Sequence, residues 1–225
     1  MNVQANFEGI RANINQACKR AGRNPDEITV IAVTKYVTIE RAKEAIEAGV
    51  TNLGENRLEG FKEKYHALDS LATWHFIGSL QSRKVKELIS EVDFIHSLDR
   101  LSLAKEINKR ADEPVSCFVQ INVSGEESKH GIHPDKVHTF IEELSKYENI
   151  KVVGLMTMAP FINDEAVIRS TFKDLRLLRD EIRDKQFAHA PCPYLSMGMS
   201  NDYSIAIEEG ATHIRIGSKL VGSSN

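Results

Sequence analysis

Short apolar runs alternate with segments of helical periodicity along nearly the whole of this 225-residue chain. The first run, Ile28–Lys35, is rich in β-branched residues and shows no polar alternation, which is typical of a strand buried on both faces of a parallel sheet. Similar runs follow at 52–55, 74–79, 94–98, 115–123, 152–158, 194–199 and 213–216. Because each helical segment returns the chain to the same edge of the sheet, parallel strands are predicted.

Eight such α/β units favour closure into a (β/α)8 TIM barrel, and an open, doubly wound sheet is the alternative. An extra amphipathic helix is predicted ahead of the first strand, since apolar residues recur at helical spacing over 7–17 and Gly22 follows as a C-cap. An apolar stripe over 85–92 predicts a helix between the third and fourth strands. No linker rich in Gly, Ser or Pro divides the sequence, so residues 1–225 are predicted to form a single domain.

Composition excludes several classes of protein. Hydrophobic residues make up 41% and charged residues 27% of the chain, the balance of a globular protein. The net charge of −3 leaves no basic surplus for binding nucleic acid or an anionic membrane. Three cysteines without a CxxC pair indicate a reducing compartment rather than a disulfide scaffold. The sequence shows no signal peptide and no apolar stretch long enough to span a bilayer, so a cytoplasmic location is predicted.

In a barrel of this type, chemistry lies at the carboxyl ends of the strands. The polar residues there are expected to point into one shared mouth. They are Lys35, Glu55, Asn56, Arg57, Ser79, Gln81, His96, Ser97, Asn122, Ser124, Thr157, Ser196, Ser200, Arg215, Gly217 and Ser218.

Lys35 is the sharpest single signal among them, because it closes an almost wholly apolar strand. A lysine at such an end is expected to be partly desolvated, which lowers its pKa and favours the neutral amine that Schiff-base chemistry needs. The alternatives are a lysine whose amino group reaches solvent and a lysine that binds phosphate.

The last two predicted strands end in Ser196–Ser200 and Arg215–Ser218. Gly198 and Gly217 would let the backbone approach a ligand closely, and loops at this place in a barrel often bind phosphate. The alternative is two ordinary turns. His75, inside a predicted strand, is more typical of a hydrogen-bonded core residue than of a catalyst. The histidines and cysteines lack metal-site spacing, and no GxSxG, Walker or GxGxxG motif is present.

Six segments point to a known family. They are AVTK ending at Lys35, LGEN at 53–56, WHFIGSLQSRK at 74–84, QINVSGEESKHGI at 120–132, VGLMTM at 153–158 and LSMGMSNDYSIAIEEGATHIRIGS at 195–218. In this order they resemble the YggS/PROSC family of pyridoxal phosphate (PLP) homeostasis proteins, over essentially the whole chain. Arg57, Ser79 and the tail after Gly217 depart from the residues common in that family. The resemblance implies a barrel similar to the N-terminal domain of alanine racemase.

The resemblance also implies a set of cofactor-binding residues: Lys35, Asn56, His75, Met199, Ser200, Arg215, Gly217 and Ser218. In the family's pattern Lys35 carries PLP, a form of vitamin B6, as an internal aldimine. Ser200 and backbone amides near Gly217 would hold the phosphate, and Met199 would add a backbone group. Arg215 would face the pyridine nitrogen, while Asn56 and His75 would line the pocket.

A cationic guanidinium at the pyridine nitrogen disfavours protonation of the ring and weakens carbanion chemistry. The racemase that the barrel resembles also needs a tyrosine from a second domain and a partner subunit. No such domain is expected in a sequence ending at Asn225, and a monomer is predicted. The predicted function is therefore to hold PLP and to buffer it or deliver it to apo PLP-dependent enzymes, with little or no catalysis. The alternatives are a PLP-dependent amino-acid racemase of low activity and a barrel acting on a phosphorylated metabolite without PLP.

Overall fold

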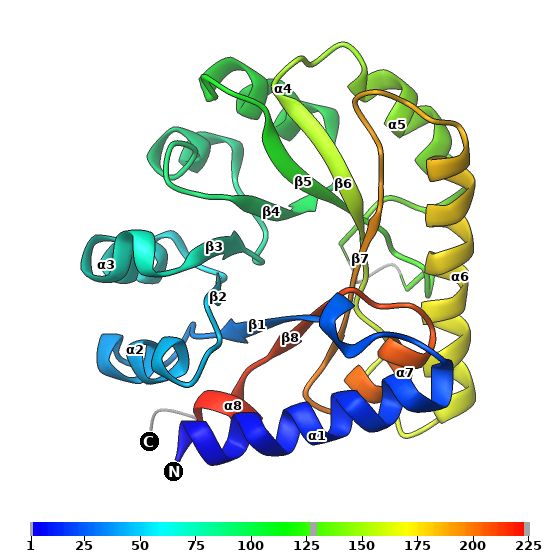
Figure 1. Ribbon diagram of the computed structural model, residues 1–225. Coiled ribbons are helices and arrows are strands. Elements are labelled where there is room, and N and C mark those ends of the chain that lie inside the picture. Colours follow the sequence, from blue (N-terminus) through cyan, green and yellow to red (C-terminus); the bar gives the residue numbers. More distant parts are fainter. Residues whose placement is uncertain (1, 127–129, 223–225) are drawn as a thin grey trace.

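The computed structural model describes residues 2–126 and 130–222, so positions 127–129 of the QINVSGEESKHGI segment lie outside the described residues. Within it, parallel strands close into a barrel in the order β1-β2-β3-β4-β5-β6-β7-β8 (Figure 1). The strands are β1 (Thr29–Val33), β2 (Asn52–Glu55), β3 (Thr73–Phe76), β4 (Phe94–Leu98), β5 (Val115–Gln120), β6 (Ile150–Met156), β7 (Tyr194–Met199) and β8 (His213–Ile216). Pairing of β1 with β8 closes the barrel, so the barrel prediction is confirmed and the open sheet is wrong.

Helices cover the outside of the barrel (Figure 1). They are α1 (Val3–Ala21), α2 (Ile39–Glu47), α3 (Leu58–Leu68), α4 (Leu101–Arg110), α5 (Val137–Leu144), α6 (Glu165–Asp184), α7 (Tyr203–Glu208) and α8 (Ser218–Val221). Short 3-10 helices lie at η1 (Pro25–Glu27), η2 (Asp69–Leu71), η3 (Ser82–Glu87) and η4 (Pro134–Lys136). Between β3 and β4, η3 stands where an α-helix was predicted. The apolar stripe over 85–92, most of which follows η3, is buried as expected, because spacing decides which side faces the core but not the hydrogen-bond period of the backbone.

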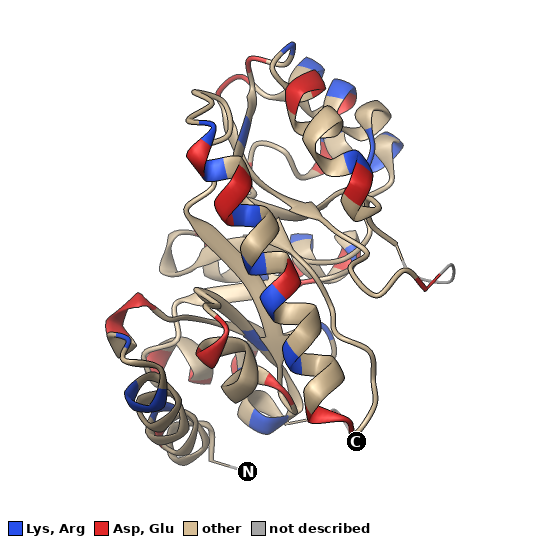
Figure 2. Cartoon of the chain, turned by 90° about the vertical axis from the view of Figure 1, so that its right-hand side faces the viewer, with Lys and Arg blue, Asp and Glu red and all other residues tan. Residues whose placement is uncertain are grey.

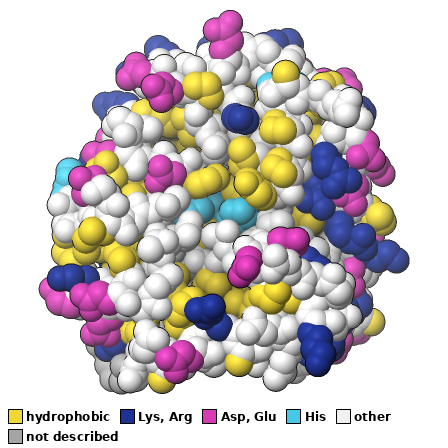
Figure 3. Space-filling model, in the orientation of Figure 1, with side chains coloured by type: hydrophobic (Ala, Val, Ile, Leu, Met, Phe, Trp, Pro, Cys, Tyr) yellow, Lys and Arg dark blue, Asp and Glu magenta, His cyan; other side chains and the backbone are white. Residues whose placement is uncertain are grey.

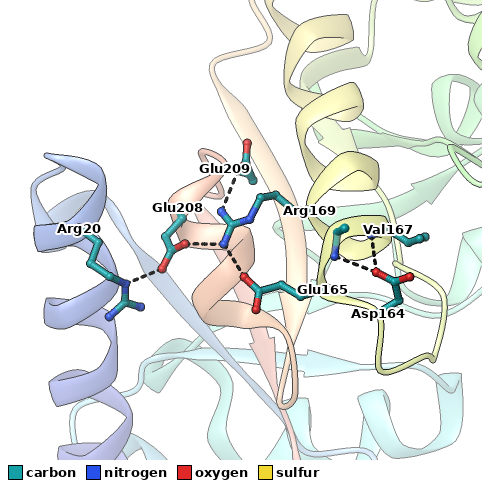
Figure 4. A network of polar contacts seen from close by, with 8 residues as sticks. Arg20, Asp164, Glu165, Val167, Arg169, Glu208 and Glu209 are labelled. Carbon is teal, nitrogen blue, oxygen red and sulfur yellow. Dashed lines mark hydrogen bonds and ion pairs between the residues drawn. The ribbon is translucent and has the colours of Figure 1, made fainter.

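The predicted N-terminal helix is confirmed as α1. The Asn2 side chain caps its first turn by accepting from the amide of Ala5, and Gly22 closes it with a left-handed φ of 64°. Figure 4 shows an ion-pair network that links α1, α7 and α6. Arg20 of α1 pairs with Glu208 of α7 at 2.6 Å, and Arg169 of α6 reaches the same carboxylate at 2.8 Å. The network ties three outer helices together at the surface.

Charged residues of both signs are interspersed over the outer helices in Figure 2, in agreement with the small net charge of the chain. All three cysteines, Cys18, Cys117 and Cys192, are buried and free. Among residues 2–126 and 130–222, none of the helices is both long and apolar enough to cross a bilayer.

Candidate functional site

The strand pairing brings most of the predicted site residues to one mouth of the barrel. Ile31 of β1 pairs with Arg215 of β8, so the turns that follow these two strands are neighbours. Met199 of β7 also pairs with Arg215. On the other side of β1, Val33 pairs with Gly54 of β2. The residues that follow these four strand ends are Lys35, Asn56, Ser200, Gly217 and Ser218.

Lys35 lies in the turn between β1 and α2, because β1 ends at Val33. Its side chain is exposed, and Nζ lies 4.9 Å from the centre of the Tyr36 ring, within cation–π range. The expected partial desolvation of this lysine is therefore wrong. The prediction assumed that the strand continued to residue 35, whereas the chain turns after Thr34. The amine is accessible to a ligand arriving from solvent.

The turn that carries Lys35 is anchored to the end of β2. Thr34 donates its amide to the carbonyl of Gly54 at 3.0 Å and its hydroxyl to Glu55 Oε1 at 2.7 Å. Glu55 is fully buried and also pairs with Lys64 Nζ of α3 at 3.0 Å. The Glu55 side chain thus lies between the barrel and α3. The prediction that it points into the mouth is wrong. Side chains alternate along a strand, so Asn52 and Asn56 take the opposite side.

Asn56 lies partly buried just after β2. Its Oδ1 atom is buried and has no hydrogen-bond partner among the described residues, an arrangement that is rare unless a ligand or water supplies a donor. Gly78 packs against the Asn56 backbone so closely that a Cβ at position 78 would lie 2.2 Å from the Asn56 carbonyl oxygen. The placement of Asn56 therefore depends on a glycine that follows β3.

We expect Gly78→Ala to destabilise the fold by about 1–3 kcal/mol, since the new methyl group would force two backbone segments apart. The matched control is Gly9→Ala at an exposed position of α1, where a Cβ would meet nothing within 4 Å. That change should instead add about 0.5–1 kcal/mol, because alanine favours a helix interior. Urea denaturation of both variants measures the difference, and equal stabilities would contradict this account of Gly78.

The turns after β7 and β8 bring several hydrogen-bond donors together, and we refer to these two turns as the anion cradle. Ser218 and Lys219 begin the short helix α8, so the helix itself offers their amides no acceptor. Lys219 Nζ donates to the carbonyl of Ser200 at 2.6 Å and so joins the two turns. Free amides, two serine hydroxyls and an ammonium group suit a phosphate dianion.

The end of β7 is shaped by close packing against α7. Gly198 has a φ of +94°, and a Cβ there would lie 2.6 Å from the Cβ of Ala206. The Met199 amide donates to Asp202 Oδ1 at 2.5 Å, which folds the chain back on itself at Ser200. Burial raises the pKa of Asp202, while the Met199 amide and the Arg215 charge oppose that shift. Asp202 and Lys219 had not been predicted, since neither closes an apolar run.

Arg215 lies on the inner side of β8 and is 5% exposed. It donates from Nη1 to Ser196 Oγ at 2.5 Å and from Nη2 to the Thr157 carbonyl at 3.0 Å. Burial lowers the pKa of Arg215 to about 10, with the Asp202 carboxylate opposing the shift, so the guanidinium remains charged at neutral pH. A fixed cation therefore lies inside the barrel on β8, flanked by β1, which leads to Lys35, and by β7.

His75 lies in the barrel interior and not among the mouth residues. It is fully buried, with Nε2 2.9 Å from Asn52 Oδ1 and Nδ1 2.9 Å from His96 Nε2. Its ring stacks on Phe94 at a centroid distance of 4.7 Å. Asn52 and Phe94 are the first residues of their strands, so this imidazole faces the amino-terminal half of the interior. The arrangement matches the alternative of a hydrogen-bonded core histidine.

Histidine side chains also lie near the centre of the face seen in Figure 3, surrounded by hydrophobic and uncharged groups. Burial, and to a smaller extent the Arg215 charge, lowers the pKa of His213 to about 4. Burial also holds the pKa values of His75 and His96 well below their ordinary value. These interior imidazoles are therefore neutral at neutral pH. Among residues 2–126 and 130–222, no group of three or more His, Cys, Asp or Glu could hold a metal ion.

The buried histidines predict a stability that falls on mild acidification. Between about pH 6.5, the ordinary histidine pKa, and about pH 4 for His213, the unfolded chain binds protons that the folded chain excludes. The free energy of unfolding should therefore be at its full value above pH 6.5. Below pH 6.5 it should fall by up to about 1.4 kcal/mol per pH unit for each such histidine. Urea denaturation at pH 7.5 and pH 5.5 measures this, and equal or greater stability at pH 5.5 would contradict it.

This barrel, with its mouth after β1, β7 and β8, is of the alanine racemase N-terminal type. The family model described as alanine racemase, N-terminal domain, matches residues 6–225. An alanine racemase of Clostridium difficile 630 shares the fold with a TM-score of 0.78 at 17% sequence identity, over 97% of this chain and 56% of that chain.

More similar proteins define the family within this class. The chain is 42% identical over 226 residues to the pyridoxal phosphate homeostasis protein of Aquifex aeolicus, covering 99% of this chain and 98% of that protein. It is 32% identical to the protein of the same description from Escherichia coli, covering 98% and 96%. The structure of PipY from Synechococcus elongatus with PLP bound matches with a TM-score of 0.81 at 29% identity, over 93% of this chain and all (100%) of that one. The chain belongs to the pyridoxal phosphate homeostasis protein family, which confirms the predicted resemblance.

Proposed function

We propose that residues 1–225 form a single PLP-binding domain that holds PLP as a Schiff base on Lys35. The observation that carries this proposal is the juxtaposition of three groups on neighbouring strand ends. An exposed primary amine follows β1, a buried cation lies on β8, and an anion cradle follows β7 and β8. PLP has an aldehyde, a ring nitrogen and a phosphate, and each has a counterpart here. PLP in the related PipY structure supports the same choice of ligand.

Each side chain has a distinct role in this proposal. Lys35 provides the nucleophilic amine, and its exposure lets a free amine or another protein's lysine compete for the aldehyde. The turns containing Ser200 and Ser218 bind the phosphate, with Met199 and Gly217 supplying backbone. The unpartnered Asn56 Oδ1 offers an acceptor to a donor on the ligand. Bound PLP supplies an electrophilic carbon and a conjugated ring that can accept electrons.

Arg215 restrains that chemistry. Its guanidinium stays charged at neutral pH and is fixed by Ser196 and Thr157. A fixed cation facing the ring nitrogen opposes protonation of that nitrogen, and the ring is then a weak electron sink. We therefore infer a carrier with little or no catalytic activity, which keeps free PLP low and passes it to apo PLP-dependent enzymes.

The proposed binding is tested by the absorbance spectrum of the purified protein after incubation with PLP, before and after borohydride reduction. We expect a visible band that borohydride removes, and a pyridoxyl mass increment on the peptide containing Lys35. A colourless, unlabelled protein would instead favour a barrel acting on another phosphorylated metabolite.

The proposed role is tested by two further measurements on the loaded protein. Transfer of PLP to an apo-enzyme should be faster than through free solution, and a rate equal to that of dissociation would contradict direct delivery. Exchange of the amino-acid α-proton with deuterated solvent should not exceed that with free PLP. A rate well above free PLP would establish a racemase-type activity.

A further inference from the structure

A chain of hydrogen bonds crosses the barrel interior behind the mouth. Arg215 Nη1 lies 2.5 Å from Ser196 Oγ, and that oxygen lies 2.8 Å from His96 Nδ1. His96 Nε2 lies 2.9 Å from His75 Nδ1, and His75 Nε2 lies 2.9 Å from Asn52 Oδ1. Ser196, His96 and His75 are all fully buried. The chain joins β8, β7, β4, β3 and β2 without reaching solvent at its three central members.

The guanidinium sets the direction of this chain, because arginine can only donate. Ser196 Oγ accepts from Arg215, and its only other polar partner among the described residues is His96 Nδ1. The Ser196 hydroxyl proton can therefore form a hydrogen bond only if Ser196 donates to His96 Nδ1. His96 then carries its proton on Nε2 and donates to His75 Nδ1. His75 in turn carries its proton on Nε2 and donates to Asn52 Oδ1, which is an acceptor.

The surroundings of both imidazoles support this single order. A neutral imidazole has one donor and one acceptor nitrogen, so it transmits the direction, and burial keeps both rings neutral. The ring of His96 stacks on Phe118 at 4.3 Å between centroids, and that of His75 on Phe94 at 4.7 Å. These contacts fix the ring planes, and bonds aligned in one direction strengthen one another.

We propose that His96 and Ser196 are positioning residues for Arg215, and that they act through a hydrogen-bond chain of fixed polarity running from Arg215 to Asn52. The chain holds Nη1 while the Thr157 carbonyl holds Nη2, so the guanidinium cannot rotate about its own axis. The consequence for PLP, a fixed interaction with the ring nitrogen, rests on the proposed function. The proton order itself does not.

Nitrogen NMR of the protein without PLP tests the order directly. We expect both His75 and His96 to be neutral and protonated on Nε2 at pH 7, with separately resolved, slowly rotating Nη groups on Arg215. Protonation of both rings on Nδ1, or a charged ring, would overturn the proposal. Failure of the wild-type protein to take up PLP would refute the proposed function. The NMR measurement would still decide whether the hydrogen-bond chain has the proposed proton order.

Variants test whether the chain positions Arg215. His96→Leu removes the acceptor for Ser196, so the Nη signals should average, the absorbance maximum of bound PLP should shift, and PLP should bind about tenfold more weakly. His96→Gln can accept from Ser196 and donate to His75, and it should restore most of each property. Ser97→Ala is the matched control, since Ser97 Oγ is buried on the same strand and has no hydrogen-bond partner among the described residues, and it should leave the Nη signals, the spectrum and PLP binding unchanged.

Two results would overturn the positioning role. One is a folded His96→Leu protein with wild-type Nη signals and spectrum. The other is a His96→Gln protein as impaired as His96→Leu. If His96→Leu does not fold, Ser196→Ala removes the same link with a smaller change in volume, and unchanged Arg215 Nη signals in that variant would refute the proposal equally.

Discussion

Lys35→Ala should abolish the pyridoxyl label that borohydride reduction fixes, and the Schiff-base absorbance band of the protein incubated with PLP. The side chain is exposed in a turn and lies over the ring of Tyr36, which is itself exposed, so the variant should keep its wild-type stability. The anion cradle and Arg215 remain in this variant. PLP should therefore still bind non-covalently and more weakly, with the spectrum of the free aldehyde.

The control for this result is Lys219→Ala, which removes the lysine that joins the turns after β7 and β8. That variant should keep the label on residue 35 and bind PLP more weakly, because one cation near the phosphate is lost. Lys35→Ala protein that showed the same visible band before reduction, and carried the pyridoxyl group after it, would show that a different lysine holds PLP. The assignment of Lys35 would then be wrong.

The barrel could be predicted from the sequence because its signal is local and repeated. Each buried parallel strand is a short β-branched run, and eight of them separated by helical patterns leave few ways to close a sheet. The mouth follows from the same pattern, since the carboxyl ends of parallel strands share one edge. This is why Lys35, Ser200 and Gly217 could be placed at the same edge of the sheet from the sequence alone.

The interior could not be predicted in this way. His96 and Ser196 are 100 residues apart in sequence, and their contact depends on strand register, tilt and the inward or outward alternation of side chains. The same uncertainty led to two errors. The exposure of Lys35 depends on a turn that begins after Thr34. Thr34 is itself β-branched, so the sequence pattern does not show that the strand has ended. Glu55 ends a strand like a site residue but faces α3.

The candidate site has an exposed outer part and a buried inner part that is fixed by hydrogen bonds. Lys35 and Ser218 are exposed, whereas Arg215 is held by buried partners on β7 and by the carbonyl of Thr157. An accessible amine suits exchange of an aldehyde with other amines, and a rigid cation suits recognition of one ring orientation. Such a division favours reversible holding of PLP over turnover of a substrate.

Removing the cation of the buried ion pair behind Lys35 should lower the free energy of unfolding more than any other single substitution in the site. Glu55 is fully buried, Lys64 is 4% exposed, and their charged atoms are 3.0 Å apart. Glu55 Oε2 has no hydrogen-bond partner among the described residues, and a Cβ at Gly60 would lie only 3.0 Å from it, so little space remains for compensating water. Lys64→Met should therefore cost about 3–5 kcal/mol, because it leaves a carboxylate buried without its cation.

The double variant Glu55→Gln/Lys64→Met should recover most of that loss, since a neutral amide needs no cation and its oxygen still accepts from Thr34. The exposed pair of Lys43 and Glu47, 3.9 Å apart, is the matched control, and Lys43→Met should change stability by less than about 0.5 kcal/mol. Urea denaturation of the four proteins gives the free energies of unfolding. A cost for Lys64→Met as small as that for Lys43→Met would mean that Glu55 is solvated and does not anchor the turn of Lys35.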